Sequence, residues 1–282
     1  MKTDRLAPHI DALNQRLAIA CNMAQAARAI TLPAFHTDIQ AQDKSADIAG
    51  ADEFDPVTAA DIAAEKCLRG FIETHFPDDG IIGEEMADKP ANNEWSWCLD
   101  PIDGTRGFVA GVPLWSTLIA VCYDGKPVIG IIDIPALSER YIGTHTHSES
   151  KAWKETPQGS TPLRTRPCLR INDAIIGCTE PMTMFSLGQK AAYEMIRRTA
   201  RFSRLGLDAY GYALVASGRM DIILEASMKP YDILALIPVI EGAGGKITNW
   251  HGGQGFDDGS VICSGDPDLL DHVYPYLKRV LD

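Results

Sequence analysis

The stretch that decides the fold is Trp97-Cys98-Leu99-Asp100-Pro101-Ile102-Asp103-Gly104-Thr105. Apolar residues lead to Asp100, Pro101 interrupts regular strand pairing, and Gly104-Thr105 can begin a helix. The pattern is therefore typical of a strand end, a bend and a helix start. Two carboxylates on so short a turn repel each other unless a cation lies between them. The sequence predicts a metal site here, and the alternative is a surface loop.

The whole chain has the composition of a globular protein. Its 282 residues allow one large domain or two packed halves, and 45% are hydrophobic while 23% are charged. The formal net charge of −12 at pH 7 makes most of the surface repel phosphate backbones. We therefore expect no nucleic-acid partner, and part of the acidity can be reserved for cations.

Cysteine usage and hydropathy predict a cytoplasmic protein. The seven cysteines are scattered, odd in number and form no CxxC pair, which is typical of reduced, mostly buried thiols. The N-terminus has no continuous apolar core of the signal-peptide type. No apolar stretch approaches the roughly 20 residues that a membrane-spanning helix needs, so we expect no membrane partner.

Two helices separated by a loop are predicted before the metal-site turn. Apolar residues at helical spacing begin at Leu6 and predict a helix that ends before Pro33. The polar, acidic residues 40–53 indicate a loop or lid. A second helix is predicted to run to Phe76, with Thr58 and Asp61 forming a capping box at its start. Asp55 has no such explanation, so it serves either the site or a turn.

Antiparallel strands follow. Residues 81–85 predict a short strand, and because neighbouring strand residues point to opposite faces, at most one of Glu84 and Glu85 faces a given cation. Asp124-Gly125 separates two apolar runs, 114–123 and 127–132, which indicates a hairpin. A further strand is expected over 139–143, and 148–167 indicates an exposed hairpin or a subdomain boundary.

Two histidines and a run of glycines resemble functional motifs but have simpler structural interpretations. His145 and His147 share a strand face, but no acid or cysteine stands at supporting spacing, so exposed loop histidines are favoured over a metal pair. Residues 242–245 follow a predicted helix and precede a strand. This is the reverse of a pyrophosphate-binding turn, so the run predicts a helix C-terminus.

The second half alternates short strands with helices, which is typical of α/β structure, whereas the first half has helices followed by antiparallel strands. We therefore predict an α+β / α/β protein of layered helices and two sheets. The N-terminal subdomain, 1–160, carries most metal ligands and the C-terminal subdomain, 161–282, completes one compact unit. The expected strands of the second half are 174–178, 202–205, 220–224, 246–249 and 260–264, and the expected helices are 188–200, 209–217, 231–242 and 267–280.

Four carboxylates at the ends of predicted strands or starts of helices define the candidate site: Glu84, Asp100, Asp103 and Asp232. Hard oxygen ligands without cysteine or histidine select Mg²⁺, with Mn²⁺ as a substitute, and the Ile102 carbonyl can add a ligand. Two or more such ions can activate a water molecule and neutralise a leaving oxygen. The helix start at Gly104 and Thr105 suits a phosphoryl group. Asp232 alone has the alternative of capping its own helix.

These motifs resemble the inositol monophosphatase family in order and spacing through most of the chain. The resemblance is carried by Gly83-Glu84-Glu85, by Asp100-Pro101-Ile102-Asp103-Gly104-Thr105 and by the upstream Asp55-Pro56-Val57-Thr58-Ala59-Ala60-Asp61. Tyr231-Asp232 and the run Glu241-Gly242-Ala243-Gly244-Gly245 complete it. The resemblance implies a layered αβαβα fold with two sheets between helices, a homodimer, and lithium-sensitive hydrolysis of a phosphate monoester with two or three Mg²⁺ ions.

The same resemblance implies a role for each matching residue. Glu84, Asp100, the Ile102 carbonyl, Asp103 and Asp232 would be metal ligands, and Glu85 a neighbouring support. The catalytic set would be Asp55, Thr105 and Glu84, with Asp55 and Thr105 orienting and deprotonating the attacking water. Gly104 and Thr105 would hold the phosphate through their N–H groups.

Within the family, the departures look like the histidinol-phosphate phosphatase branch. They are Arg106-Gly107-Phe108, residues 130–135 and 139–143, and Lys229-Pro230-Tyr231-Asp232. The resemblance implies that Asp103, Asp208 and Glu225 hold the substrate, and carboxylates can pair with the ammonium and imidazole groups of histidinol phosphate. For Asp208 the alternative is a helix N-cap.

Three rival functions stay open at this point. Inositol 1-phosphate or another small phosphate monoester is the second candidate substrate, because a ring of hydroxyls also accepts carboxylate partners. A bisphosphate is disfavoured because the sequence shows no basic cluster for a second phosphate. The rival without catalysis is a regulatory protein that binds cations or phosphate and has lost turnover.

Overall fold

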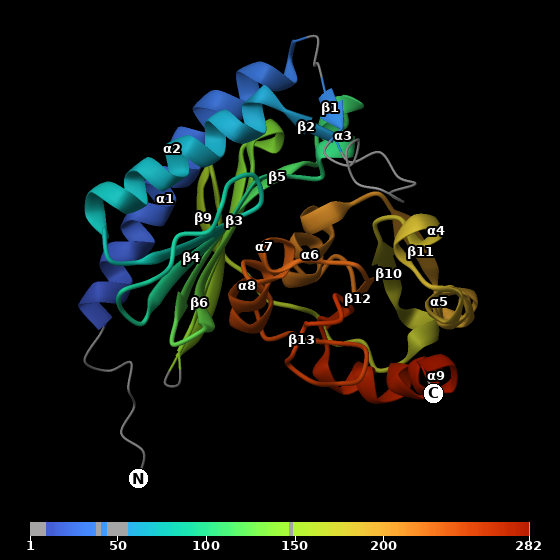
Figure 1. Cartoon of the computed structure of the whole chain (residues 1–282). Coiled ribbons are helices and arrows are strands. Elements are labelled where there is room, and N and C mark those ends of the chain that lie inside the picture. Colours follow the sequence, from blue (N-terminus) through green and yellow to red (C-terminus); the bar gives the residue numbers. More distant parts are fainter. Residues whose placement is uncertain (1–9, 38–40, 44–55, 147–148, 282) are drawn as a thin grey trace.

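Five layers build the molecule in this computed structural model, which describes residues 10–37, 41–43, 56–146 and 149–281. Figure 1 shows two helices on one face of a large sheet, further helices between that sheet and a smaller one, and helices beyond the smaller sheet. The predicted αβαβα order is therefore confirmed. In the described residues, no helix combines the length and the apolar character that crossing a membrane requires.

The first layer is the antiparallel pair α1 (Ile10–Phe35) and α2 (Ala59–His75). The prediction that the first helix ends before Pro33 is wrong. Pro33 costs one backbone hydrogen bond, but the last turn continues because Phe35 packs against Phe108 and Trp115. The capping box at Thr58 is confirmed: the backbone N–H of Thr58 donates to the Asp61 carboxylate at 2.8 Å.

A two-stranded sheet precedes α2. It pairs β1 (Ala41–Asp43) with β2 (Pro56–Thr58), so the part of the predicted loop or lid at residues 41–43 is a strand instead. The rest of that predicted loop, residue Asp55 and the predicted start of the first helix at Leu6 lie outside the described residues.

The large sheet has seven strands in sequence order, with the first pair parallel and the others antiparallel. The predicted hairpin at Asp124-Gly125 is confirmed, and both residues have the positive φ that a two-residue hairpin turn needs, 50° and 72°. The strands are β3 (Gly80–Gly83), β4 (Trp95–Asp103), β5 (Ser116–Tyr123), β6 (Lys126–Ile134), β7 (Glu139–His145), β8 (Ser150–Thr156) and β9 (Gly159–Pro162).

The end of β4 differs from the prediction. Pro101 does not end the strand, because an irregular register between Asp100 and Asp103 absorbs the residue that lacks an N–H, and Asp103 pairs again with Ser116. The Thr117 hydroxyl donates to the Pro101 carbonyl at 2.8 Å. Strand β3 ends at Gly83, so Glu84 follows the strand instead of belonging to it.

The middle layer consists of α6 (Asp208–Ala216), α7 (Pro230–Ile233) and α8 (Leu236–Gly242). The prediction of one helix over 231–242 is wrong because Pro238 has no N–H to donate to the carbonyl four residues earlier. Helix α8 lies directly on the large sheet: a Cβ added at Gly130 would stand 2.0 Å from the Ala235 carbonyl oxygen. As predicted, the glycine run ends this helix, with the Gly245 N–H donating to the Ile240 carbonyl.

The small sheet has the strand order β11-β10-β12-β14-β13, parallel over the first three strands and antiparallel over the rest. Its strands are β10 (Ile175–Cys178), β11 (Phe202–Leu205), β12 (Ile222–Glu225), β13 (Lys246–Thr248) and β14 (Val261–Ser264). The outer layer is α5 (Leu187–Thr199) and α9 (Leu270–Leu281). The short segments of the described residues are α3 (Thr105–Val109), α4 (Pro181–Met184) and the 3₁₀ turns Pro135–Leu137, Ile171–Asp173 and Pro267–Leu269.

Of the four apolar clusters in the described residues, a small one groups Ala60, Ile102, Phe108 and Trp115, and the other three fill the spaces between the layers. One joins α1 and α2 to the large sheet, one lies around the middle helices, and one joins the small sheet to α5 and α9. The middle cluster holds residues of both sheets, such as Leu118 and Ile223, which ties the two halves together. The division at residue 160 stays a prediction, and that residue lies within β9.

Candidate metal and phosphate site

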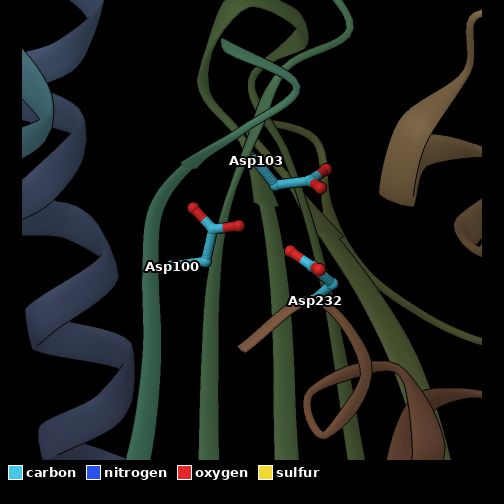
Figure 2. Close-up of side chains that lie close together, drawn as sticks. All are labelled: Asp100, Asp103 and Asp232. Atoms are coloured by element: carbon cyan, nitrogen blue, oxygen red, sulfur yellow. The ribbon is translucent and has the colours of Figure 1, made fainter. Parts of the chain in front are cut away.

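Three aspartates, two from the large sheet and one from the middle layer, meet at the irregular end of β4. Asp100 and Asp103 extend from β4 and Asp232 extends from α7, and Figure 2 shows their carboxylates around a common space. One oxygen from each lies within 4.8 Å of the others. Asp100 is buried and the other two are half-buried. The convergence of Asp232 with the β4 pair, which lies about half the chain away, is therefore confirmed as geometry.

The electrostatics of this cluster call for a cation. Burial raises the pKa of Asp100 well above its ordinary value, and the nearby Glu84, Asp103 and Asp232 raise it further. Burial, followed by the charge of Asp208, likewise raises the pKa of Asp103. In the described part of the chain, neither Asp100 nor Asp103 forms an ion pair with lysine or arginine. An all-carboxylate set of this kind fits Mg²⁺ or Mn²⁺.

Hydrogen bonds orient the carboxylates. The Ser116 hydroxyl and the Ala209 N–H both donate to Asp103 Oδ2 at 3.0 Å, which leaves Oδ1 to face the cluster. The Ile102 N–H donates to Asp100 Oδ1 at 3.0 Å. Asp232 Oδ2 accepts the Lys229 N–H at 2.6 Å, so the alternative role of Asp232 at its helix start exists alongside its place in the cluster.

Glu84 reaches the cluster from the segment after β3. Its N–H donates to the Leu99 carbonyl at 3.2 Å, which aligns the segment with β4. The next residue, Glu85, donates its N–H to Glu65 of α2 at 2.7 Å. Arg69 pairs with the other oxygen of Glu65 at 2.8 Å and also binds the carbonyls of residues 86 and 87. This arrangement supports Glu84 beside Asp100 and gives Glu85 a supporting place.

Asp61 is the acid that the sequence reasoning assigned to helix capping alone. It is fully buried, and Thr58 occupies Oδ2 through its N–H and its hydroxyl, while Oδ1 has no hydrogen-bond partner. Burial raises the pKa of Asp61, and the charge of Glu84 adds to the increase. A buried carboxylate oxygen with no donor is costly. The sequence did offer one signal for a role of Asp61 at the site: it is an acid in the first turn of a helix that follows Asp55, a residue already considered for the site.

The predicted helix start at Gly104 and Thr105 is confirmed as α3. Gly104 has φ of 79°, and a Cβ there would stand 3.0 Å from the Asp208 carboxyl carbon, so glycine is needed for the backbone and for the space. The Thr105 hydroxyl donates to the Ile102 carbonyl at 2.9 Å. A carbonyl oxygen has a second lone pair, so the Ile102 carbonyl can accept this hydrogen bond and still bind a cation, as predicted.

A cavity of about 510 Å³ extends from this cluster toward the small sheet. Asp103, Gly104, Thr105, Asp208 and Asp232 line it beside the cluster, and Thr179, Glu180 and Glu225 line it where β10 and β12 end. The structure therefore brings the predicted phosphate and alcohol sites into one space. The predicted ligands Glu84, Asp100 and Ile102 do not line this cavity. His145 lies away from it and contacts Glu241 at 3.3 Å and Ser150 at 2.7 Å, and His147 lies outside the described residues.

Two further carboxylates line the cavity: Asp208, which is half-buried beside Gly104, and Glu225, which is buried at the end of β12. Burial raises the pKa of Asp208 to about 6, against the lowering effect of Arg106. Burial raises the pKa of Glu225 to about 8 despite two donated hydrogen bonds from Thr179. The alternative of Asp208 as a helix N-cap is wrong: Leu207 occupies that position, and Asp208 is the first helical residue with a strained φ of 47°.

Comparisons with known proteins agree with this geometry. The family model described as the inositol monophosphatase family matches residues 12–281. The bifunctional phosphatase IMPL2, chloroplastic, of Arabidopsis thaliana is 39% identical over 80% of this chain, which spans 66% of that protein. A histidinol-phosphatase of Chlorobaculum parvum is 33% identical over 89% of this chain and 92% of its own.

A solved structure, an inositol monophosphatase from Zymomonas mobilis, superimposes with a TM-score of 0.80 at 33% identity, covering 95% of this chain and 99% of its own. The layered fold, the convergent aspartates and the match over nearly the whole chain lead to one conclusion. The chain belongs to the inositol monophosphatase family, whose members are metal-dependent phosphatases.

Proposed function

We propose that this phosphatase hydrolyses L-histidinol phosphate to L-histidinol and inorganic phosphate, with Mg²⁺ as the cofactor. The observation that carries the proposal is the distribution of charge along the cavity. The aspartate cluster adjoins the start of α3, the Asp208 carboxylate packs against Gly104, and the buried Glu225 carboxylate lines the same cavity at the end of β12. A substrate with a phosphate and cationic groups matches this set, because ions at the cluster would bind the phosphate and the two further carboxylates would pair with the cationic groups.

Two or three Mg²⁺ ions would be held by Glu84, Asp100, Asp103, Asp232 and the Ile102 carbonyl. When bound, they supply Lewis-acid stabilisation of the phosphoryl oxygens and a more acidic water. The α3 N–H groups of Gly104 and Thr105 orient the phosphate. Asp103 would contact both ions and substrate, because it borders the cluster and the cavity.

The water-orienting acid has two candidates, Asp55 and Asp61. The resemblance points to Asp55, with Thr105 as its partner. Asp61 has an unpartnered buried oxygen and lies next to Ala60, which packs with Ile102 in one apolar cluster. We favour Asp61. Replacing each by Asn decides between them: loss of turnover in D61N with activity kept in D55N supports Asp61, and the opposite result supports Asp55.

The substrate proposal is tested by phosphate release from L-histidinol phosphate and inositol 1-phosphate at matched concentrations with Mg²⁺. We expect a higher kcat/KM for histidinol phosphate. Faster turnover of inositol 1-phosphate would make this protein an inositol monophosphatase instead. Stabilisation by Mg²⁺ with no release from any phosphate monoester would favour the regulatory protein without catalysis.

The proposal extends to the oligomeric state of the protein and to its cellular compartment. We propose a cytoplasmic homodimer without nucleic-acid or membrane partners. Seven free cysteines support a reducing compartment. Large apolar side chains are exposed on neighbouring elements of one side of the molecule, α4, α5 and the edge strand β11: Met182, Leu187, Phe202 and Leu205. Sedimentation of the wild type and of L187E tests the dimer, since the charged variant should be monomeric.

A further inference from the structure

Thr179 makes the strongest contacts to the carboxylate of Glu225. Its backbone N–H donates to Glu225 Oε1 at 2.7 Å and its hydroxyl donates to the same oxygen at 2.8 Å. Thr179 directly follows β10 and Glu225 ends the neighbouring strand β12, so adjacent strand ends bring the two residues together. Both residues line the cavity.

The two oxygens of Glu225 have unequal surroundings. Oε1 has two strong donors, whereas the contact of Oε2 is the Cys178 thiol at 3.7 Å, which is a weak donor. The pair of bonds from Thr179 fixes the orientation of the carboxylate and keeps Oε2 as the oxygen with acceptor capacity left. Glu225 is 2% exposed, so this unused capacity is costly unless a ligand supplies a donor.

In the described part of the chain, the groups that influence Glu225 most carry no positive charge. The titratable groups that influence it are Asp208 and Tyr212 of α6, Cys178 of β10 and Tyr193 of α5. All four are neutral or negative at neutral pH. Burial opposes the charged form of Glu225, and the two bonds from Thr179 favour it. Thr179 therefore acts on both the orientation of this carboxylate and its tendency to be charged.

We propose that Thr179 is a positioning residue that selects substrates whose alcohol portion is cationic, because it holds Glu225 with Oε2 available to that portion. The inference rests on the proposed function, since it assigns Glu225 to the substrate's alcohol portion. Thr179 acts through Glu225 and not on the phosphate end, so its effect falls on binding and on the choice of substrate, not on the chemical step.

The test compares T179V, which keeps the shape and the backbone N–H but loses the hydroxyl, with T179S, which keeps the hydroxyl. For L-histidinol phosphate at pH 7, we expect T179V to raise KM by about tenfold with little change in kcat, since the variant loses a hydrogen bond to the carboxylate that ionises when the cationic substrate binds. T179S should retain the wild-type KM. For inositol 1-phosphate, KM should stay within about twofold in both variants. Equal effects on the two substrates, or no effect on either, would overturn the proposal.

Two further measurements separate Thr179 from general stability. In an E225Q background, T179V should add no further increase in KM, since both changes act on one carboxylate. Additive effects would contradict the proposal. The increase caused by T179V should also shrink as the pH rises, because Glu225 then ionises without the hydroxyl.

If histidinol phosphate is not hydrolysed at all, the proposed function fails, and Thr179 is still tested by NMR of ¹³C-labelled Glu225. The titration of its carboxyl carbon should move to higher pH in T179V and stay in place in T179S. An unchanged titration in T179V would overturn the positioning role independently of any substrate.

Discussion

The buried carboxylates of this molecule divide into two groups. Seven are buried in the described residues, and four of these contact an arginine at 2.6 to 2.8 Å. Asp61, Asp100 and Glu225 contact no lysine or arginine in the same part of the chain, and burial raises the pKa of each. The arginine-paired group comprises Glu65 with Arg69, Asp79 with Arg16, Asp133 with Arg28 and Arg140, and Asp221 with Arg166.

This difference distinguishes the acids that stabilise the fold from the acids of the candidate site. In the paired group, the chain supplies its own counter-charge, so these acids connect elements such as α1 to the large sheet. In the second group, the chain supplies hydroxyl and backbone donors but no cation. These acids belong to or lie beside the aspartate cluster, or line the cavity, so we propose that ions or substrate supply their counter-charge when bound.

The largest effect is expected for Asp103→Asn. The amide oxygen can keep the bonds from Ser116 and Ala209, so the amide nitrogen turns toward the cluster and repels a cation. Mg²⁺-dependent phosphate release should fall by more than about 100-fold, while circular dichroism stays unchanged. Mg²⁺ should raise the melting temperature of the wild type, and a chelator should reverse this. Turnover retained by the variant would show that Asp103 is no ligand.

Asp79→Asn tests the paired group. This change leaves the buried Arg16 guanidinium without its counter-charge, although Phe76 and Trp95 still contact its faces. The free energy of unfolding should fall by about 3–5 kcal/mol. At temperatures where the variant is folded, kcat/KM should match the wild type. Urea unfolding and steady-state kinetics measure the two quantities, and a loss of activity without loss of stability would erase the distinction between the groups.

Glu225→Gln tests the pH dependence of the second group. Burial raises the pKa of Glu225 from 4.5 to about 8, so between these values the folded protein holds a proton that the unfolded chain releases. The wild type should therefore lose stability relative to the variant as the pH rises through this window, with a slope up to about 1.4 kcal/mol per pH unit, and level off above it. Urea unfolding at several pH values, with chelator present, measures the difference. Parallel curves would argue against a buried Glu225 of raised pKa.

Ser116→Ala has the smallest expected effect. It removes one of the two donors that orient Asp103, so divalent-ion affinity should weaken by about 10–100-fold, measured by calorimetric titration with Mn²⁺. Thr31→Val is the matched control, since it removes a buried hydroxyl bonded to the Ala27 carbonyl in α1. Equal affinities in the two variants would leave Ser116 without a positioning role.

The sequence predicted the features that depend on neighbouring residues. The capping box at Thr58, the Asp124-Gly125 hairpin and the helix start after Gly104 each follow from local backbone chemistry. The two sheets with layered helices followed from the alternation of predicted strands and helices, and Asp232 was grouped with the β4 acids because all are hard oxygen ligands at element ends; the family resemblance added the αβαβα order. The catalytic and ligand roles of these residues stay predictions.

What the sequence could not predict depends on contacts between distant elements. Phe35 carries α1 past Pro33 because of its aromatic neighbours in other segments. Nothing in the sequence distinguishes Ser116 and Thr179 from other hydroxyl residues. Strand pairing places them beside Asp103 and Glu225. Asp61 had a sufficient local role, which concealed its buried, unpartnered oxygen.

The close contact of α8 with the backbone of the large sheet fixes the position of Asp232. Because the helix rests on Gly130 and Gly143 without side chains between them, its distance from the sheet admits no larger residue. Asp232 belongs to α7, the short helix that precedes α8. The distance between the Asp232 and Asp100 carboxylates therefore depends on how closely α8 packs on the sheet. Any side chain larger than glycine at position 130 or 143 would push α8 away from the sheet, and the candidate metal site would widen with it.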